Sequence, residues 1–334
     1  MDLNTLWYLL LSILFTGFFL LEGFDYGVGI LVPMVSRSDQ DRRLLFNAIG
    51  PFWDANEVWL ITAGGAMFAA FPDWYATLFS GFYLPLFIIL LALILRGVSF
   101  EFRSKAASPL WRLAWDAAFF LGSALPALLW GVALANLLIG VPIDASMTYV
   151  GGFWNLLTPA TLLTGITGFL IFTLHGASFL RMKVEGELLD RVQRTANRLW
   201  PVTVVIGGLA VFWMSRERSG ASGLVTALIA AGFLALIAGG WLSMRKHNGW
   251  AFAFTSAAIV SLTASLFAGL FPNVMISSLD AAWNLTIYNA ASTPYTLKVM
   301  SVIALTLLPF VLLAQGWSYY IFRKRLDAET HLEY

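Results

Sequence analysis

Long apolar runs, separated by short polar or Gly/Pro-rich breaks, follow one another along the whole chain. A helix needs about 20 apolar residues to cross the hydrocarbon core of a bilayer, so the pattern predicts an all-α, polytopic membrane protein with about nine transmembrane helices. These helices would form a single integral membrane domain over residues 1–334. The predicted spans are residues 5–33, 45–70, 75–96, 113–138, 158–180, 199–214, 222–242, 250–271 and 296–322.

The first predicted span lies within the sequence MDLNTLWYLLLSILFTGFFLLEGF and its continuation. It lacks the basic leading segment and the small-residue cleavage site of a secretory signal, so we expect it to be retained as a helix. Gly23, Gly27, Gly29 and Pro33 could end this helix early, because glycine and proline weaken or stop helices.

The overall composition agrees with a lipid environment. Hydrophobic residues make up 59% of the chain and charged residues 12%, and the mean hydropathy is +0.77. A net charge of +1 argues against nucleic acid as a partner. Cysteine is absent, which excludes disulfides and thiolate metal sites.

The distribution of basic residues predicts the orientation of the chain. All but three of the 20 Lys and Arg residues lie in alternate connections or in the C-terminal tail. The exceptions are Arg216, Arg218 and Lys298. Because basic connections face the cytoplasm, we expect the N-terminus outside and the C-terminus in the cytoplasm, with an odd number of crossings.

Two short segments hint at an internal repeat. Trp154-Asn155-Leu156, ahead of the fifth span, resembles Trp283-Asn284-Leu285, ahead of the ninth. A four-helix repeat would explain the likeness, and so would the general suitability of Trp and Asn for a membrane interface. The sequence leaves both explanations open.

Four carboxyl groups fall inside the predicted spans, where an ionised carboxylate costs at least ~2.5 kcal/mol. Glu22 and Asp25 lie three residues apart on the first span, and Asp54 and Glu57 repeat that spacing on the second, so each pair shares one helical face. Counted from the basic segment 36–44, the aspartates lie roughly 15 Å and the glutamates roughly 20 Å along their helices. We therefore expect all four carboxyls to meet.

Four carboxylates this close cannot all remain ionised, so one or more would hold a proton, or the group would bind a cation. Either arrangement suits a proton path or an ion site, for which these four acids are the candidates. The alternative is a structural role, in which polar neighbours satisfy the acids. Those neighbours are Asn47, Trp53, Asn56, Trp59 and Thr62.

Other charged residues near the spans carry less information. We expect Glu101, Arg103 and Lys105 to be solvated charges at the membrane interface, and the sequence alone does not assign Arg96 or Asp116.

Haem inside membrane helices needs His or His/Met axial ligands. Of three histidines, His247 falls in a basic loop and His331 in the tail, which leaves His175 as a lone candidate. We expect His175 to be a polar residue at a helix end, and this chain to bind neither haem nor a metal ion.

Three dense segments in the first third of the chain carry a family resemblance: GFDYGVG at 23–29, GPFWDANEVWLITAGGAMFAAFP at 50–72 and YATLFSGFYLPLFIILLALILRGVSFEFRSK at 75–105. Over these segments the chain resembles subunit II of the cytochrome bd-type quinol oxidases. The likeness continues more loosely through residues 111–116 and 137–142. Beyond them it becomes a matching order of hydropathy.

The resemblance implies a heterodimer in the prokaryotic cell membrane. Subunit I would carry the quinol site and three haems, two of type b and one of type d or b, and this chain would be its nine-helix, non-haem partner and scaffold. Together they would oxidise quinol and reduce dioxygen to water, taking protons from the cytoplasmic side and generating a proton-motive force. The family's interfacial proton path includes the aspartate of the W-D-x-N motif, here Asp54, and the aspartate of the GFD motif is Asp25.

The resemblance also suggests further components. A small single-helix accessory subunit would join some complexes, and a structural quinone or lipid would lie between helices. Aromatic residues that could line such a site are Trp53, Trp59, Phe68 and Phe71.

A function from another class is compatible with the same residues. The four carboxyls could form the ion site of a self-contained cation or proton secondary transporter. An oxidase subunit should depend on a haem-bearing partner for stability, whereas a transporter should fold and exchange ions alone.

Overall fold

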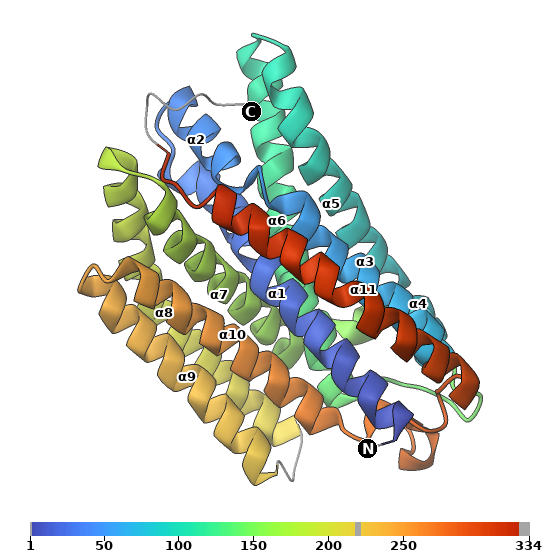
Figure 1. The fold of residues 1–334 in the computed structure, drawn as a ribbon. Helices are drawn as coiled ribbons and strands as arrows, with labels where there is room; N and C mark the ends of the chain where they lie inside the picture. The colour runs from blue at the N-terminus through green and yellow to red at the C-terminus, as the bar shows by residue number, and fades with distance from the viewer. Residues whose placement is uncertain (1, 218–221, 327–334) are drawn as a thin grey trace.

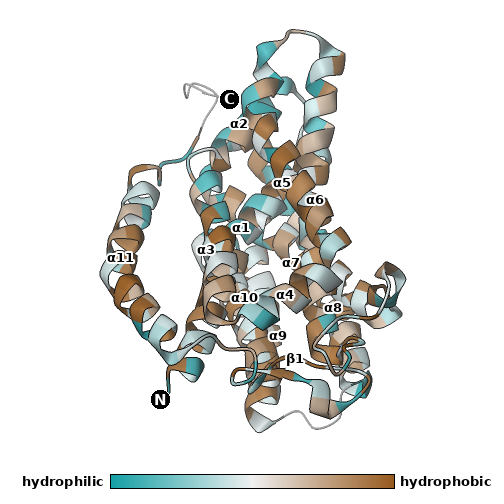
Figure 2. Cartoon of the chain, turned by 90° about the vertical axis from the view of Figure 1, so that its right-hand side faces the viewer, coloured by the Kyte–Doolittle hydropathy of each residue, from teal (hydrophilic) through white to brown (hydrophobic). Residues whose placement is uncertain are grey.

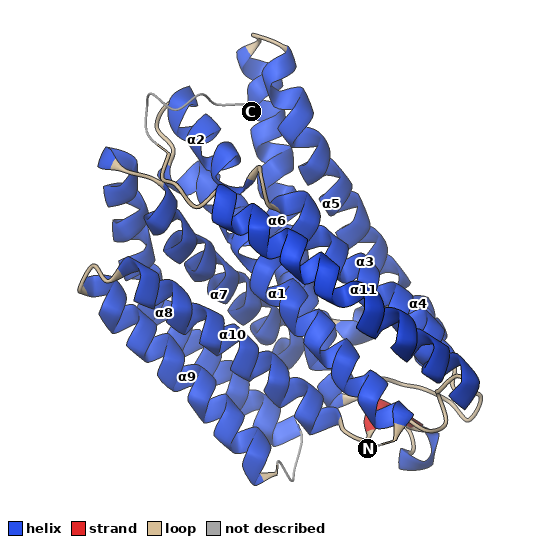
Figure 3. Ribbon diagram, viewed as in Figure 1, coloured by secondary structure: helices blue, strands red, loops and turns tan. Residues whose placement is uncertain are grey.

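The computed structural model describes residues 2–217 and 222–326, and Arg218 and His331 lie outside this part of the chain. The described residues form a bundle of helices with two very short strands (Figures 1 and 3). The helices are α1 (Leu3–Val35), α2 (Asp39–Ile49), α3 (Trp53–Ala70), α4 (Pro72–Gly81), α5 (Tyr83–Phe102), α6 (Pro109–Ile139), α7 (Pro159–Lys183), α8 (Gly186–Glu217), α9 (Gly223–Met244), α10 (Asn248–Leu270) and α11 (Pro294–Ile321); the strands are β1 (Asn273–Met275) and β2 (Leu285–Thr286).

Eight of the described helices, α1 and α5 to α11, are long and apolar enough to cross a membrane. They correspond to eight of the predicted spans, and α3 occupies the place of the remaining one. The third predicted span, residues 75–96, is not one helix, because it contains most of α4 and the first part of α5. Its 18 residues extend about 27 Å, but its first turns contain Asp54, Asn56 and Glu57. Helix α3, which carries two of the candidate acids, is therefore not among the described helices that are apolar enough to cross a membrane.

The second predicted span, residues 45–70, is not one helix. It contains the end of α2 and all of α3, separated at Gly50 and Pro51. Proline lacks a backbone N–H and clashes with the preceding turn, which explains the break. The polar helix α2 starts at a capping box formed by Ser38 and Asp41.

Helix α1 runs unbroken through its glycines to Val35, which confirms the predicted first span and shows that the glycines do not end it early. The glycines serve close packing instead. A Cβ atom on Gly27 would clash with the backbone oxygen of Phe172, and one on Gly176 would clash with the backbone of Gly27. Small residues allow α1 and α7 to cross backbone to backbone, as in many membrane helix pairs.

The described basic connections gather at one end of the bundle. The segment with α2, the turn between α5 and α6, and the turn between α7 and α8 lie at the end opposite the N-terminus (Figure 1). Strands β1 and β2 lie near the N-terminus. This arrangement agrees with alternating charge, and the assignment of the basic end to the cytoplasm remains a prediction.

The two segments with the Trp-Asn-Leu sequence lie at the opposite end, where each follows one long helix and precedes another. Asn155 accepts a hydrogen bond from the Gly152 backbone N–H at 2.8 Å, and Asn284 accepts one from Ser277 at 2.8 Å. The two connections also meet, since the Val141 N–H donates to the Ile276 carbonyl at 2.9 Å. The local likeness is real, and the four-helix repeat stays a prediction.

Helix α11 stands at the edge of the bundle (Figure 2). In the most apolar 18-residue stretch of α11 only 6% is buried, whereas in that of α7 61% is buried. Its side chains therefore face lipid or a partner rather than this chain's own core.

Candidate functional site

Three of the four predicted acids gather around one arginine. Glu22 and Asp25 on α1 are fully buried, and so is Arg96 on α5. One guanidinium nitrogen, Arg96 Nη2, contacts the carboxylates of both Glu22 and Glu57, the latter at 2.6 Å. Asp25 lies one turn from Glu22 and interacts electrostatically with Arg96 and Glu57.

Arg96 is the member of this cluster that the sequence alone did not assign. As a single charge near the end of a long apolar run it resembles an interfacial residue, whereas the fold turns it into the core. Its guanidinium lies 5.0 Å from the ring centroid of Tyr26, which supplies a cation–π contact. A buried charge persists only when it is paired, so the arginine and the acids require one another.

The fourth acid, Asp54, does not join this cluster. It is exposed on the outer surface of α3, while Asn56 is fully buried and Glu57 is at the rim with 19% of its side chain exposed. Successive residues of a helix are separated by about 100°, so Asp54 points away when Asn56 points inward. The expected meeting of all four carboxyls is wrong in this respect.

Several polar atoms of the cluster have unused hydrogen-bonding capacity. Asp25 Oδ1, Tyr26 OH and the Nε and Nη1 atoms of Arg96 are buried without a partner in the described chain. Buried groups of this kind are commonly satisfied by ordered water. The cluster is therefore a polar, protonatable centre within an apolar bundle, and no group of His, Asp and Glu in the described residues has the arrangement of a metal site.

The predicted supporting residues surround this centre. Asn56 donates from Nδ2 to Asp25 Oδ2 at 2.7 Å. Trp59 donates to Gln315 Oε1 on α11 at 2.9 Å, and Trp53 stacks on Phe100 with ring centroids 4.8 Å apart. Asn56 therefore contacts one of the acids, Trp59 contacts α11, and Trp53 packs between helices.

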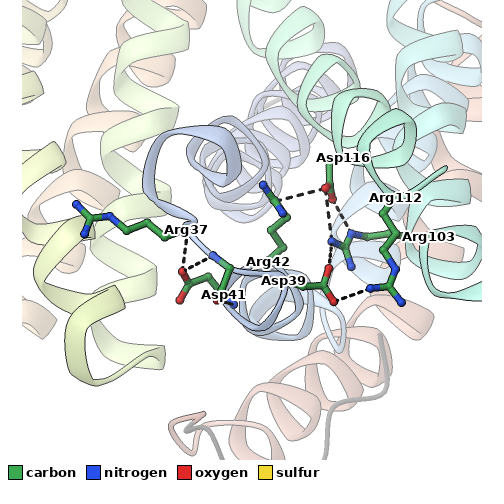
Figure 4. Close-up of polar contacts among 8 residues, drawn as sticks. Arg37, Asp39, Asp41, Arg42, Arg103, Arg112 and Asp116 are labelled. Atoms are coloured by element: carbon green, nitrogen blue, oxygen red, sulfur yellow. Dashed lines mark hydrogen bonds and ion pairs between the residues drawn. The ribbon is translucent and has the colours of Figure 1, made fainter. Parts of the chain in front are cut away.

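A second charged cluster lies at the basic end of the bundle. Figure 4 shows Asp39 of α2 between Arg103 and Arg112, at 2.7 and 3.2 Å, and Asp116 of α6 between Arg103 and Arg42, at 2.5 and 3.4 Å. Arg103 is buried, so the expectation that it is a solvated charge is wrong. The cluster ties α2 to the turn between α5 and α6.

His175 is also placed differently from the expectation. It is fully buried rather than at a helix end. Its Nδ1 lies 2.9 Å from Thr255 Oγ1 on α10 and its Nε2 lies 3.0 Å from the Leu20 carbonyl on α1. Both ring nitrogens are engaged, so His175 links three helices.

An apolar cavity of about 540 Å³ lies among α3, α4, α5 and α6. Of the four aromatic residues that could line a quinone or lipid site, Phe68 lines this cavity, whereas Trp53, Trp59 and Phe71 do not. Trp74, which also lines it, has a buried indole N–H without a partner in the described chain. The cavity could hold an elongated apolar molecule that offers an oxygen acceptor to Trp74.

Comparisons with known proteins agree over the whole chain. The family model described as cytochrome bd terminal oxidase subunit II matches residues 3–322. A Bacillus subtilis relative, cytochrome bd ubiquinol oxidase subunit 2, is 42% identical over 340 residues that cover 100% of this chain and 99% of the relative. The Escherichia coli K12 cytochrome bd-I ubiquinol oxidase subunit 2 is 35% identical and covers 99% of this chain and 98% of its own length.

Among solved structures, a chain in the bd oxidase from Geobacillus thermodenitrificans has the same fold. The TM-score is 0.77 at 18% sequence identity, over 96% of this chain and 97% of that chain.

Arg96→Leu should lower the free energy of unfolding by about 3–5 kcal/mol, because the buried carboxylates lose their counter-ion. Adding Glu22→Leu should recover part of that loss, because the double variant no longer buries the Glu22 carboxylate without its counter-ion. Thermal unfolding of the purified protein in detergent, measured for wild type, the two single variants Arg96→Leu and Glu22→Leu and the double variant, gives a double-mutant cycle. Strictly additive losses would show that the two residues do not interact.

Low pH should weaken the second charged cluster, because it protonates Asp39. Burial of the Asp39 carboxyl disfavours its charge, but the hydrogen bond from Arg103 and the charges of Arg103, Arg112 and Arg42 outweigh burial and hold its pKa below the ordinary value. Ionised Asp39 therefore stabilises the fold at neutral pH, and this contribution is lost as pH falls through the lowered pKa.

Asp39→Asn should cost about 0.2–1 kcal/mol at pH 7, a small value because the carboxylate is partly exposed. The difference from wild type should shrink and disappear as pH falls through the lowered pKa of Asp39. Unfolding temperatures measured across pH test this, with the exposed Asp190→Asn as control. A difference that persists unchanged at low pH would contradict a role for the Asp39 charge.

Proposed function

The chain belongs to the cytochrome bd terminal oxidase subunit II family, and from this premise we propose that it scaffolds the haem-bearing subunit I and supplies a proton path to it. As a member of that family it is a component of a respiratory quinol oxidase. It is a multi-pass protein of the prokaryotic membrane. The relatives from B. subtilis and E. coli are named as subunits of ubiquinol oxidases. The complex would oxidise quinol and reduce dioxygen to water.

The observation that carries the proton path is the series of acids from the surface of α3 into the core. Asp54 is exposed on that surface, Glu57 is at the rim, and Glu22 and Asp25 are fully buried. Reduction of dioxygen to water consumes protons, which need protonatable groups or water to cross an apolar bundle. A partner that covers the outer surface of α3 would enclose Asp54 and make it the first acid of the route.

Subunit I is the proposed occupant of the exposed surfaces of α3 and α11. The family implies haems in the complex, and we assign all three, two of type b and one of type d or b, to subunit I. Support comes from His175, whose ring nitrogens both have partners inside this chain. The side chains of this chain would then position the partner and hold protons, while the haems supply electron transfer when the complex is assembled.

A structural quinone or lipid would occupy the apolar cavity among α3 to α6. The Trp74 N–H would donate to an oxygen of the head group, and Phe68 and Leu93 would contact the apolar tail of the same molecule. Gly64 and Gly65 line the same cavity, and a Cβ on either would meet nothing within 4 Å.

Asp54→Asn should slow quinol-driven oxygen consumption by about one order of magnitude or more while the haem content stays intact, because the route loses a protonatable group. Oxygen uptake and a reduced-minus-oxidised absorption spectrum of the purified complex measure the two quantities. Asp73→Asn, an exposed carboxyl in the first turn of α4, is the control. Normal turnover in Asp54→Asn would remove this residue from the route.

The same purification separates the oxidase from the transporter. Haem bands and a second, histidine-bearing chain support the oxidase. A colourless protein that is stable alone would favour the self-contained cation or proton transporter.

Gly64→Leu should displace the molecule in the cavity, because its side chain would project into that space. Mass spectrometry of an organic extract should find about one quinone or phospholipid per wild-type chain and clearly less in the variant. Gly208→Leu is the control, since Gly208 on α8 also has open space around it but lies outside the cavity. Equal amounts in Gly64→Leu and wild type would refute this site.

A further inference from the structure

Helix α11 is held to the bundle by polar contacts rather than by burial. Leu297 is its only buried residue in the described chain. Near its start, the Trp7 indole donates to the Leu297 carbonyl at 3.0 Å and to Ser301 Oγ at 3.1 Å. Near its end, the contacts come from Gln315 and Tyr319, which lie four residues apart on one face.

The contacts near the end of α11 form a chain with a fixed direction. The indole nitrogen of Trp59 can only donate, so the Gln315 group facing it must be the carbonyl oxygen, at 2.9 Å. The amide nitrogen of Gln315 then faces Asn56 and donates to its Oδ1 at 3.2 Å. Tyr319 donates to the same Oδ1 at 2.9 Å.

This arrangement settles the orientation of the buried Asn56 amide. With its oxygen toward α11, its nitrogen must point toward α1, where it donates to Asp25 Oδ2 at 2.7 Å and to the Leu21 carbonyl at 3.4 Å. The amide oxygen thus accepts two hydrogen bonds and the nitrogen donates two, which uses its full capacity. A donor at Asp25 favours the ionised form of that oxygen.

We propose that Trp59, Gln315, Tyr319 and Asn56 are positioning residues. The first three fix the Asn56 amide as a donor to Asp25, and this amide sets how tightly the acid holds its proton. The proposal rests on the proposed proton path for its functional meaning. It also gives α11 a specific role, because the side chains of Gln315 and Tyr319 on this helix orient the amide that contacts an acid on α1.

Other charged or titratable groups face Asp25 from the surrounding helices. They are Glu22 on α1, Glu57 on α3, Arg96 on α5 and Tyr319 on α11. The experiment therefore has to observe Asp25 itself.

Infrared difference spectra of the purified complex, induced by a change of pH, provide such an observation. The carbonyl band of protonated Asp25 is assigned by its loss in Asp25→Asn. In Trp59→Phe and in Gln315→Leu, the amides are free to turn and present an oxygen to Asp25, so the band should persist to higher pH by about one unit.

Trp7→Phe is the matched control. It also removes an indole donor to α11, but at the end of that helix that does not touch Asn56. A shift in the Trp59 and Gln315 variants without a shift in Trp7→Phe supports the proposal. The proposal is overturned if the Asp25 band keeps its pH dependence in both the Trp59 and the Gln315 variant. It is also overturned if the pH dependence shifts equally in all three variants, because docking of α11 alone would then be responsible.

This readout is independent of the proton path. If Asp25→Asn retains full oxygen consumption, the path through Asp25 fails, and the infrared band still decides whether the amide chain controls the acid.

Discussion

The buried guanidinium of Arg96 holds the centre of this bundle together. Removing a charge from water costs several kcal/mol, so the core accepts Arg96 only because Glu22 and Glu57 meet it directly. That requirement brings α1, α3 and α5 into contact at one level. It also explains why fully buried acids can persist there, since each carboxylate that faces the arginine is partly neutralised.

Close helix packing makes this electrostatic arrangement attainable. The Gly27 and Gly176 backbones touch where α1 crosses α7, and His175 hydrogen-bonds to both α1 and α10. These contacts hold α1, with Glu22 and Asp25, in one rotational setting. Helix α11 has no such backbone contact, and its attachment depends on a few polar side chains and on the stacking of Tyr319 against Phe52. A partner subunit that covers the outer surface of α11 would supply the burial that this helix lacks within its own chain.

Much of the candidate site could be predicted from residue types and spacing. Acids three residues apart on apolar helices indicated a polar centre, and three of the four do meet. Asp54 could not be placed, because its direction depends on the rotation of α3, which is set by Asn56 and by the break at Gly50 and Pro51. Arg96 and Arg103 were missed because a basic residue near the end of an apolar run looks the same in sequence whether it faces solvent or the core.

The sequence by itself determined that the chain is an all-α membrane protein of the subunit II family, since hydrophobic run length and dense local motifs are properties of consecutive residues. Only the tertiary structure decided which acid lies outside the cluster, which arginine neutralises it, and that an indole on α3 and a glutamine on α11 orient the Asn56 amide toward Asp25. These features join residues up to 259 positions apart. Their pairing depends on helix rotation and packing, which no local pattern encodes.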